Sequence, residues 1–118
     1  MKDPKKHGIG APAVGVGHGN NGVLLYKDIV TYNAEYHAQA VYDKDTVSEY
    51  SYKGADWIGY DWPTSVAKKV EYAKAHHLGG YFFWALGYDM NWNLSATGKF
   101  SSRAVFIFPT RIKYPIPK

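Results

Sequence analysis

The chain has 118 residues, four more Lys and Arg than Asp and Glu, and no cysteine. This length is enough for one domain, whereas a complete (β/α)₈ barrel needs about 250 residues. The absence of cysteine excludes a disulfide scaffold and thiolate zinc sites. Aromatic residues are in excess, with eleven Tyr, five Phe and four Trp. Because aromatic faces stack on sugar rings and on bases, this excess is a first indication of a binding function.

The distribution of charge and hydropathy argues against two classes of partner. The Lys residues are scattered except in 1–6 and at Lys68–Lys69, so we expect no nucleic-acid partner. The longest apolar run, Tyr81–Leu86, is far shorter than the about 20 residues that span a bilayer, so we expect no membrane partner. No apolar run follows the charges of Met1–Gly8, so we expect no secretory signal. The protein is then cytosolic, or the chain is not a complete precursor.

The first half of the chain predicts a small α+β unit. Residues 1–22 are rich in Gly, which predicts a loop with a short strand at Ala13–Val16. Apolar residues at helical spacing then predict a helix over 22–35. Short runs separated by turn residues predict three strands: Gln39–Asp43, Glu49–Lys53 and Asp56–Tyr60. Together, these elements predict an antiparallel meander beside one helix.

The second half predicts a helix followed by a buried strand. Apolar residues at the 3.6-residue period predict a helix over 66–77. We expect this helix to have its N-cap at Thr64 or Ser65 and to end at Gly79-Gly80. The continuous apolar run Tyr81–Leu86 is typical of a strand that is buried on both faces, as in a parallel sheet or barrel.

The last residues, 99–118, differ in character from the rest of the chain. They contain one apolar run and three prolines. This composition leaves two alternatives open, an edge strand at Ala104–Phe108 or a loose tail.

Local motifs give little indication of a cofactor. Gly17–Gly22 has the form G-x-G-x-x-G and Asp43 lies about 20 residues further on, as in dinucleotide-binding sites. The segment before it is a poor buried strand, however, so we interpret Gly17–Gly22 as a structural turn. His76-His77 are adjacent at a predicted helix end, where a cation favours the helix dipole. No His, Asp or Glu spacing indicates a metal site, and we expect neither a metal nor a cofactor.

An ordered series of short motifs resembles the C-terminal part of glycoside hydrolase family 18, most closely the plant class V chitinases and chitinase-like proteins. The motifs of the second half are Trp57–Asp61, Ser65-Val66, Lys69-Val70, Tyr72–Lys74 and Leu78–Trp84. Upstream, His7–Ala13, Gly22, Tyr26 and Val41-Tyr42 resemble the insertion domain of the same proteins. The resemblance covers about residues 7–98.

The resemblance implies a fold class and a division of the chain. In these proteins a small α+β insertion domain interrupts an eight-stranded (β/α)₈ barrel after its seventh strand. Residues 1–61 are then similar to the insertion domain, 62–98 to the last barrel helix and strand, and 99–118 form a divergent tail. We therefore expect an α+β chain that carries an incomplete barrel.

The resemblance also implies which residues bind the sugar. Trp84 matches the family's Trp at the end of the eighth strand, which forms the floor under the sugar at the cleavage point. Tyr60, Asp61 and Trp57 are weaker candidates for lining the groove. The family's catalytic D-x-x-D-x-D-x-E motif belongs on the fourth barrel strand and does not occur in these residues, so we assign no catalytic residue. Relatives are extracellular or vacuolar.

Two functions follow as hypotheses. The first is a truncated chitinase-like protein of chitin metabolism. It would retain part of a groove for a chitooligosaccharide or a related N-acetylglucosamine polymer, but would not hydrolyse the polymer by itself. The alternative is a small non-catalytic lectin-like or interaction domain.

Overall fold

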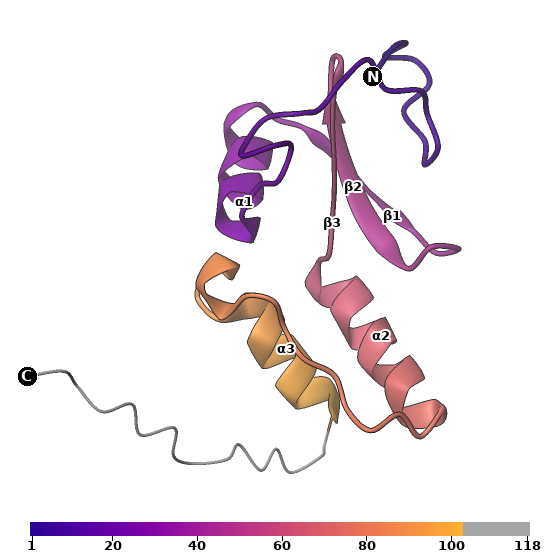
Figure 1. Ribbon diagram of the computed structural model, residues 1–118, viewed down its shortest axis with the longest axis vertical. Helices are drawn as coiled ribbons and strands as arrows, with labels where there is room; N and C mark the ends of the chain where they lie inside the picture. The colour runs from indigo at the N-terminus through magenta and orange to yellow at the C-terminus, as the bar shows by residue number, and fades with distance from the viewer. Residues whose placement is uncertain (103–118) are drawn as a thin grey trace, which may run out of the picture.

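The computed structural model describes residues 1–102 of the chain. A helix and a three-stranded sheet form one half, and two helices that lie side by side form the other (Figure 1). The elements in chain order are α1 (Tyr26–Glu35), β1 (Gln39–Asp43), β2 (Ser48–Lys53), β3 (Asp56–Tyr60), α2 (Pro63–Ala75), the 3₁₀ helix η1 (Leu86–Tyr88) and α3 (Asn93–Ser102).

The sheet confirms the predicted meander. Its strand order is β1-β2-β3, and both pairs are antiparallel. Tyr50 in the central strand lies opposite Val41 on one side and Gly59 on the other. Two predicted strands have the observed bounds, and β2 begins one residue earlier than expected.

The first helix is shorter than the predicted 22–35 because the residues before it have partners outside the helix. Asn20 and Val23 form an isolated β-bridge, and Leu25 is the extended N-cap residue. The strand predicted at Ala13–Val16 is wrong, since this segment has no strand in the structure. A glycine-rich segment without a neighbouring strand has neither the propensity nor the hydrogen-bond partners for a ladder.

Side-chain hydrogen bonds join α1 to the third strand. Tyr32 donates its hydroxyl to Asp56 Oδ2 at 2.8 Å, and Asn33 Nδ2 donates to the Tyr60 hydroxyl at 3.1 Å. Asp56 and Tyr60 are an even number of residues apart, so their side chains lie on the same face of β3. This face of the sheet is therefore the one that α1 covers. His18 Nε2 also lies 3.2 Å from Asp56 Oδ2 and connects the N-terminal loop to the same point.

The start of α2 differs from the prediction. Trp62, rather than Thr64 or Ser65, is the N-cap residue, and Pro63 occupies the first helical position. Proline suits this position because its missing N–H would have no partner inside the helix. Ser65 still has a capping role, since its Oγ accepts a hydrogen bond from the backbone N–H of Trp62 at 3.0 Å.

The end of α2 also differs from the prediction, which placed it at Gly79-Gly80. The helix ends at Ala75, and His77 takes the left-handed conformation with φ 52°. Leu78 N–H donates to the Ala73 carbonyl at 2.9 Å and His77 N–H to the Lys74 carbonyl at 3.1 Å. These two bonds form a Schellman motif, which satisfies the last carbonyls of the helix without glycine.

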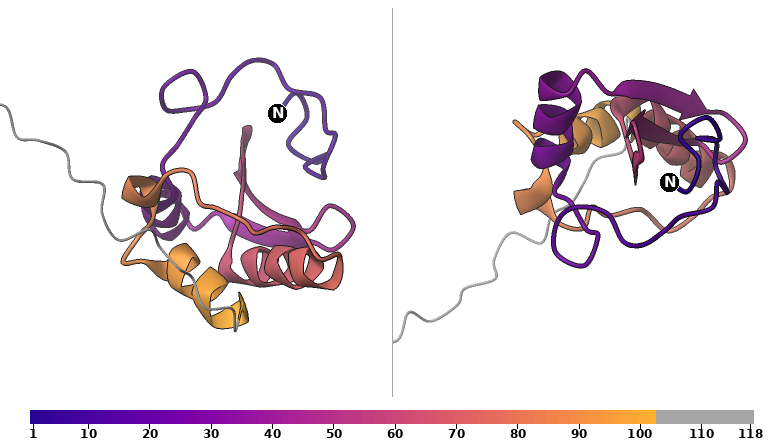
Figure 2. Two further views of the ribbon diagram at one scale, coloured as in Figure 1. Left: turned by 60° about the horizontal axis from the view of Figure 1, so that its bottom comes forward. Right: turned by 90° about the horizontal axis from the view of Figure 1, so that it is seen from above.

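The prediction of a buried strand at Tyr81–Leu86 is wrong. Within residues 1–102, this segment pairs with no strand and runs as an irregular chain between α2 and α3 (Figure 2). Phe82 is 84% exposed and Trp84 is 86% exposed. A strand needs a neighbouring strand for its backbone hydrogen bonds, and the apolar sequence cannot supply one. The alternative strand at Ala104–Phe108 lies outside the described residues.

Helices α2 and α3 pack against each other and enclose part of the core. Val66, Val70 and Ala73 form a buried stripe along α2. The Phe83 ring lies so close to Gly98 of α3 that a Cβ at this position would be 2.6 Å from the ring. Tyr81 adds a hydrogen bond from its hydroxyl to the Gly98 carbonyl at 2.7 Å. The absence of a side chain at position 98 thus lets the segment before η1 lie on α3.

The substitution Val70→Ala tests this core. Val70 is 2% exposed, so removing two methyl groups should lower the free energy of unfolding by about 1–3 kcal/mol. Val14→Ala is the matched control, because Val14 is 75% exposed and its truncation should leave stability unchanged. Urea denaturation followed by circular dichroism measures both. Equal effects of the two substitutions would contradict the assignment of the core to α2.

Candidate sugar-binding site

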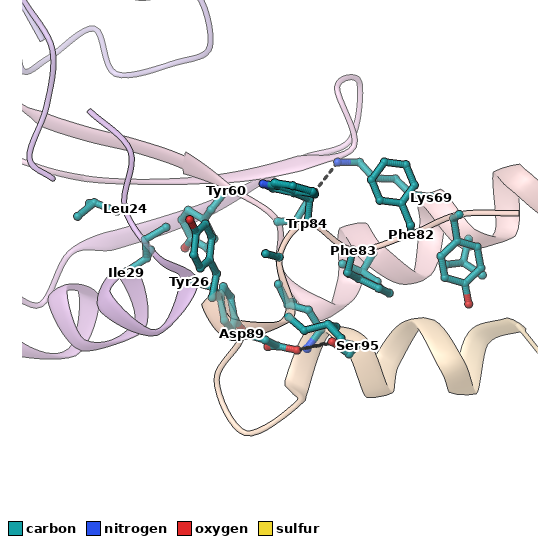
Figure 3. A pocket seen from close by; sticks show the side chains of 18 of the residues that line it. Leu24, Tyr26, Ile29, Tyr60, Lys69, Phe82, Phe83, Trp84, Asp89 and Ser95 are labelled. Atoms are coloured by element: carbon teal, nitrogen blue, oxygen red, sulfur yellow. Dashed lines mark hydrogen bonds and ion pairs between the residues drawn. The ribbon is translucent and has the colours of Figure 1, made fainter. Parts of the chain in front are cut away.

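A cavity lies between α1, the end of β3, the start of α2 and the segment that follows α2 (Figure 3). Its volume is about 460 Å³, which is within the about 300–1,000 Å³ of small-molecule sites. Its lining is largely aromatic and aliphatic, with three charged side chains: Asp61, Lys69 and Asp89. A mostly apolar surface with a few polar groups is suited to a ligand that has both apolar faces and hydrogen-bonding edges.

Three of the four predicted site residues line this cavity together. Trp84 comes from the irregular segment after α2, whereas Tyr60 and Asp61 come from the end of β3. In the view of Figure 3 the Trp84 ring is seen between the labelled side chains of Tyr60 and Lys69, and most of its surface is exposed. The buried strand predicted at Tyr81–Leu86 would place Trp84 in the core, and its exposure in the structure does not fit that position.

The fourth predicted residue, Trp57, does not line the cavity. Its indole stacks on Tyr50, with ring centroids 5.5 Å apart and planes at 20°. Its Nε1–H donates to the His7 carbonyl at 3.0 Å. The ring also lies against Gly59, which does line the cavity. Trp57 is therefore a neighbour of the cavity rather than a part of its wall.

Asp61 has two hydrogen-bond partners within the protein, and both bond to the same oxygen. Its Oδ1 lies 2.5 Å from Lys69 Nζ and 2.9 Å from Ser65 Oγ. No hydrogen bond from the described residues reaches its second oxygen, Oδ2. A carboxylate oxygen accepts hydrogen bonds only, so Oδ2 can receive a hydroxyl or amide N–H from a ligand.

Two tyrosine hydroxyls near the cavity stay protonated. Burial raises the pKa of Tyr26 to about 12, although a hydrogen bond from Asn93 opposes the shift. Burial also raises the pKa of Tyr60, although the hydrogen bond from Asn33 by itself would lower it. Both groups are thus neutral hydroxyls at physiological pH and act as hydrogen-bonding groups rather than as bases.

Asp89 closes the cavity and caps α3. Its Oδ1 accepts hydrogen bonds from the backbone N–H groups of Met90 and Leu94. Its Oδ2 accepts hydrogen bonds from the backbone N–H and the side-chain hydroxyl of Ser95. Burial by itself would raise the pKa of Asp89, but these hydrogen bonds outweigh it and lower the pKa below its usual value. The carboxylate holds the start of α3 in place at the edge of the cavity.

Sequence reasoning did not assign Lys69, Tyr26 or Asp89 to this site. Lys69 was noted only for its charge and for its place in a motif of the family, yet it lines the cavity and forms an ion pair with Asp61. Tyr26 was noted only for its match to the insertion domain. The sequence could have indicated the role of Lys69. A lysine about two turns into a helix is long enough to contact a residue at the end of the preceding strand, eight residues earlier in the chain.

The other candidate motifs have structural roles. Gly17–Gly22 forms a turn in which Gly19 has φ 91°, and a Cβ on Gly19 would be 2.2 Å from the Val23 carbonyl oxygen. No strand precedes this turn, which agrees with its interpretation as a structural turn. His76 and His77 lie at the C-terminal end of α2, as expected. Residues 1–102 contain no cluster of His, Asp and Glu that could hold a metal ion and no helix long and apolar enough to cross a membrane.

Comparison with known proteins identifies the family of this chain. The sequence profile of the family Glycosyl hydrolases family 18 matches residues 2–89. The chain belongs to this family. Nod factor hydrolase protein 1 from Medicago truncatula is 52% identical over 100 residues, which are 84% of this chain and 26% of that protein. The chain thus spans about a quarter of the length of the curated relatives that it matches.

Solved structures of family 18 proteins share the fold of this chain. A class V chitinase from Nicotiana tobaccum in complex with NAG4 superposes with a TM-score of 0.84 at 37% identity, over 88% of this chain and 31% of that chain. A chitinase-like agglutinin from Robinia pseudoacacia superposes with a TM-score of 0.72 at 39% identity, over 86% of this chain and 28% of that one. The resemblance inferred from the sequence motifs is confirmed.

Removing the Asp89 carboxylate should change how stability depends on pH. Because the folded-state pKa of Asp89 is lowered, its contribution is present above the unfolded pKa of about 4 and is lost as pH falls through the folded value. Asp89→Asn should lower the free energy of unfolding at pH 7 by about 1 kcal/mol. It should lower that free energy much less at pH 2.

Denaturation of both forms between pH 7 and pH 2 measures this difference. The pKa values of Asp43 and Asp56 are also lowered by hydrogen bonds, so the variant should retain part of the acid sensitivity. A variant with the same deficit at pH 2 as at pH 7 would contradict the role of the Asp89 carboxylate.

Proposed function

We propose that this chain forms part of a chitooligosaccharide-binding groove of a family 18 protein, and that its 118 residues do not hydrolyse chitin by themselves. The observation that carries the proposal is the Trp84 ring, 86% exposed in a cavity whose other wall holds Tyr60 and Asp61. The tobacco class V chitinase with a similar fold was solved with a bound N-acetylglucosamine tetramer, NAG4. We extend the ability to bind such a ligand to this chain.

The chemistry of the cavity suits an N-acetylglucosamine polymer. The C–H faces of a pyranose are apolar and stack on an indole, and Trp84 offers the largest such surface in the cavity. The hydroxyl and amide groups at the edges of the sugar need hydrogen-bond partners when water is removed. Asp61 Oδ2 and the Tyr60 hydroxyl can serve as these partners. Trp57, beside Gly59, extends the aromatic surface beyond the cavity.

The division of the chain follows from the same proposal. Residues 1–61 would form the insertion domain, and 62–98 would contribute the last helix and strand to a (β/α)₈ barrel. In such a barrel Tyr81–Leu86 would gain the neighbouring strands that it lacks within the described residues, which explains its apolar sequence. Helix α3 runs across the expected boundary at Lys99, so it includes the first residues of the divergent tail.

Hydrolysis needs a group that these residues do not contain. The family's D-x-x-D-x-D-x-E motif does not occur in the sequence, and its Glu is the proton donor to the leaving oxygen. General acid catalysis contributes about 10²–10⁴-fold to such reactions. Tyr26 and Tyr60 are weak acids with raised pKa values, so neither replaces a carboxylic acid.

Trp84→Ala tests the groove. Loss of one stacking ring should weaken binding of the N-acetylglucosamine tetramer by about tenfold or more, since one such contact contributes about 1–3 kcal/mol. Tyr72→Ala is the matched control, because Tyr72 is a 60% exposed aromatic residue of α2 that does not line the cavity. Isothermal titration calorimetry gives the affinities. Loss of binding in both variants, or in neither, would refute the assignment of Trp84.

The second candidate function is that of a lectin-like domain. The fold similarity to a chitinase-like agglutinin favours it. Product analysis separates it from an enzymatic function: after long incubation with the tetramer, mass spectrometry should find intact tetramer only. Shorter oligomers that appear with the wild type but not with Trp84→Ala would show hydrolysis and overturn the non-catalytic proposal.

A further inference from the structure

Two buried side chains that do not line the cavity accept hydrogen bonds from Trp62, the residue after Asp61. Ser65 has no exposed surface and Glu49 is only 6% exposed. We propose that Glu49 and Ser65 are positioning residues, which orient the Asp61 carboxylate toward the N–H and hydroxyl groups of a bound chitooligosaccharide. The ligand in this inference rests on the proposed function, whereas the orientation of Asp61 can be tested without any ligand.

The first step of the support joins the sheet to helix α2. Glu49 lies on β2 directly opposite Tyr60, and its Oε2 accepts the backbone N–H of Trp62 at 3.0 Å. Trp62 is the N-cap residue of α2, so this hydrogen bond ties the central strand to the start of the helix. An acidic group at this end of a helix also interacts favourably with the helix dipole.

The second step joins the helix start to the cavity. Ser65 Oγ accepts the same Trp62 N–H at 3.0 Å. Its hydroxyl hydrogen has two acceptors within reach, Asp61 Oδ1 at 2.9 Å and the Trp62 carbonyl at 3.0 Å. The carboxylate is the stronger acceptor because it is charged. Glu49 and Ser65 therefore hold the residues on both sides of the Asp61–Trp62 peptide bond.

The third step concerns the two carboxylate oxygens of Asp61, which have different partners. Oδ1 receives Ser65 and Lys69, so its capacity is used within the protein. Oδ2 can therefore accept a hydrogen bond from a ligand in the cavity. The ion pair with Lys69 is not enough to fix this arrangement, because the side chains of Lys69 and Asp61 are 48% and 39% exposed and exposed pairs constrain geometry weakly. The buried pair Glu49 and Ser65 supplies the rigid part.

Glu49→Ala tests the orientation directly. We expect exchange of the Trp62 amide hydrogen to become about tenfold faster, as loss of one hydrogen bond implies. The ¹³C resonance of the Asp61 carboxyl carbon should shift as well. Glu49→Gln keeps an oxygen acceptor and should restore both signals. Glu71→Ala is the matched control, because Glu71 is exposed on α2 and forms its ion pair with Lys68, away from Asp61.

The affinity for the N-acetylglucosamine tetramer separates positioning from general destabilisation. Glu49→Ala should weaken binding about five- to tenfold, in line with one lost hydrogen bond. In an Asp61→Ala background the same substitution should cause no further loss, because Glu49 acts through Asp61. Calorimetry well below the unfolding temperature measures all four forms of this cycle.

Several outcomes decide the proposal. The proposal would be overturned if Glu49→Ala lowered the affinity equally in the wild type and in the Asp61→Ala background. It would also be overturned if the Asp61 resonance were unchanged in folded Glu49→Ala. If Glu49→Ala does not fold, Ser65→Ala replaces it with the same expectations for the Asp61 resonance and the affinity cycle. If the wild type binds no tetramer, the proposed function fails, while the Trp62 exchange and the Asp61 resonance still decide whether Glu49 orients Asp61.

Discussion

The junction between the sheet and helix α2 depends on the hydrogen bonds around Asp61. The strand β3 ends at Tyr60 and the helix begins at Pro63, so only two residues connect them. Such a short connection leaves backbone N–H groups that need acceptors, and Glu49 and Ser65 both accept from Trp62. The same connection fixes Tyr60 and Asp61 at the cavity. One set of polar contacts thus determines both the angle between two elements and the position of two candidate ligand groups.

The aromatic residues divide into two groups with different surroundings. Tyr26 and Tyr50 are almost fully buried and belong to the core. Phe82 and Trp84 are largely exposed, although their sequence is the most apolar of the chain. Apolar surface on this scale is costly in water, which is why large exposed patches mark surfaces that bind a ligand or another part of a protein. The cavity and the apolar segment around Trp84 are consequently parts of one incompletely covered surface.

The elements that the sequence predicted well are those governed by local rules. The three strands are short, have turn residues between them and pair with their sequence neighbours, so their bounds could be read almost without error. The ends of α2 were less accurate, because Trp62, whose side chain has no acceptor oxygen, is the N-cap residue, and a histidine at φ 52° takes the place expected of a glycine. Tyr81–Leu86 was wrong as a strand, since pairing depends on a partner and not on hydrophobicity.

The sequence by itself determined the family, the meander and three of the residues around the cavity, because ordered motifs and local periodicity do not depend on the rest of the fold. Only the tertiary structure decided that Trp57 lies beside the cavity, that Lys69 belongs to it, and that Trp84 is exposed. It alone also connected Glu49 to Trp62, which are 13 residues apart. Such contacts arise where separate elements meet, and the distance between two side chains there is set by packing rather than by their spacing in the chain.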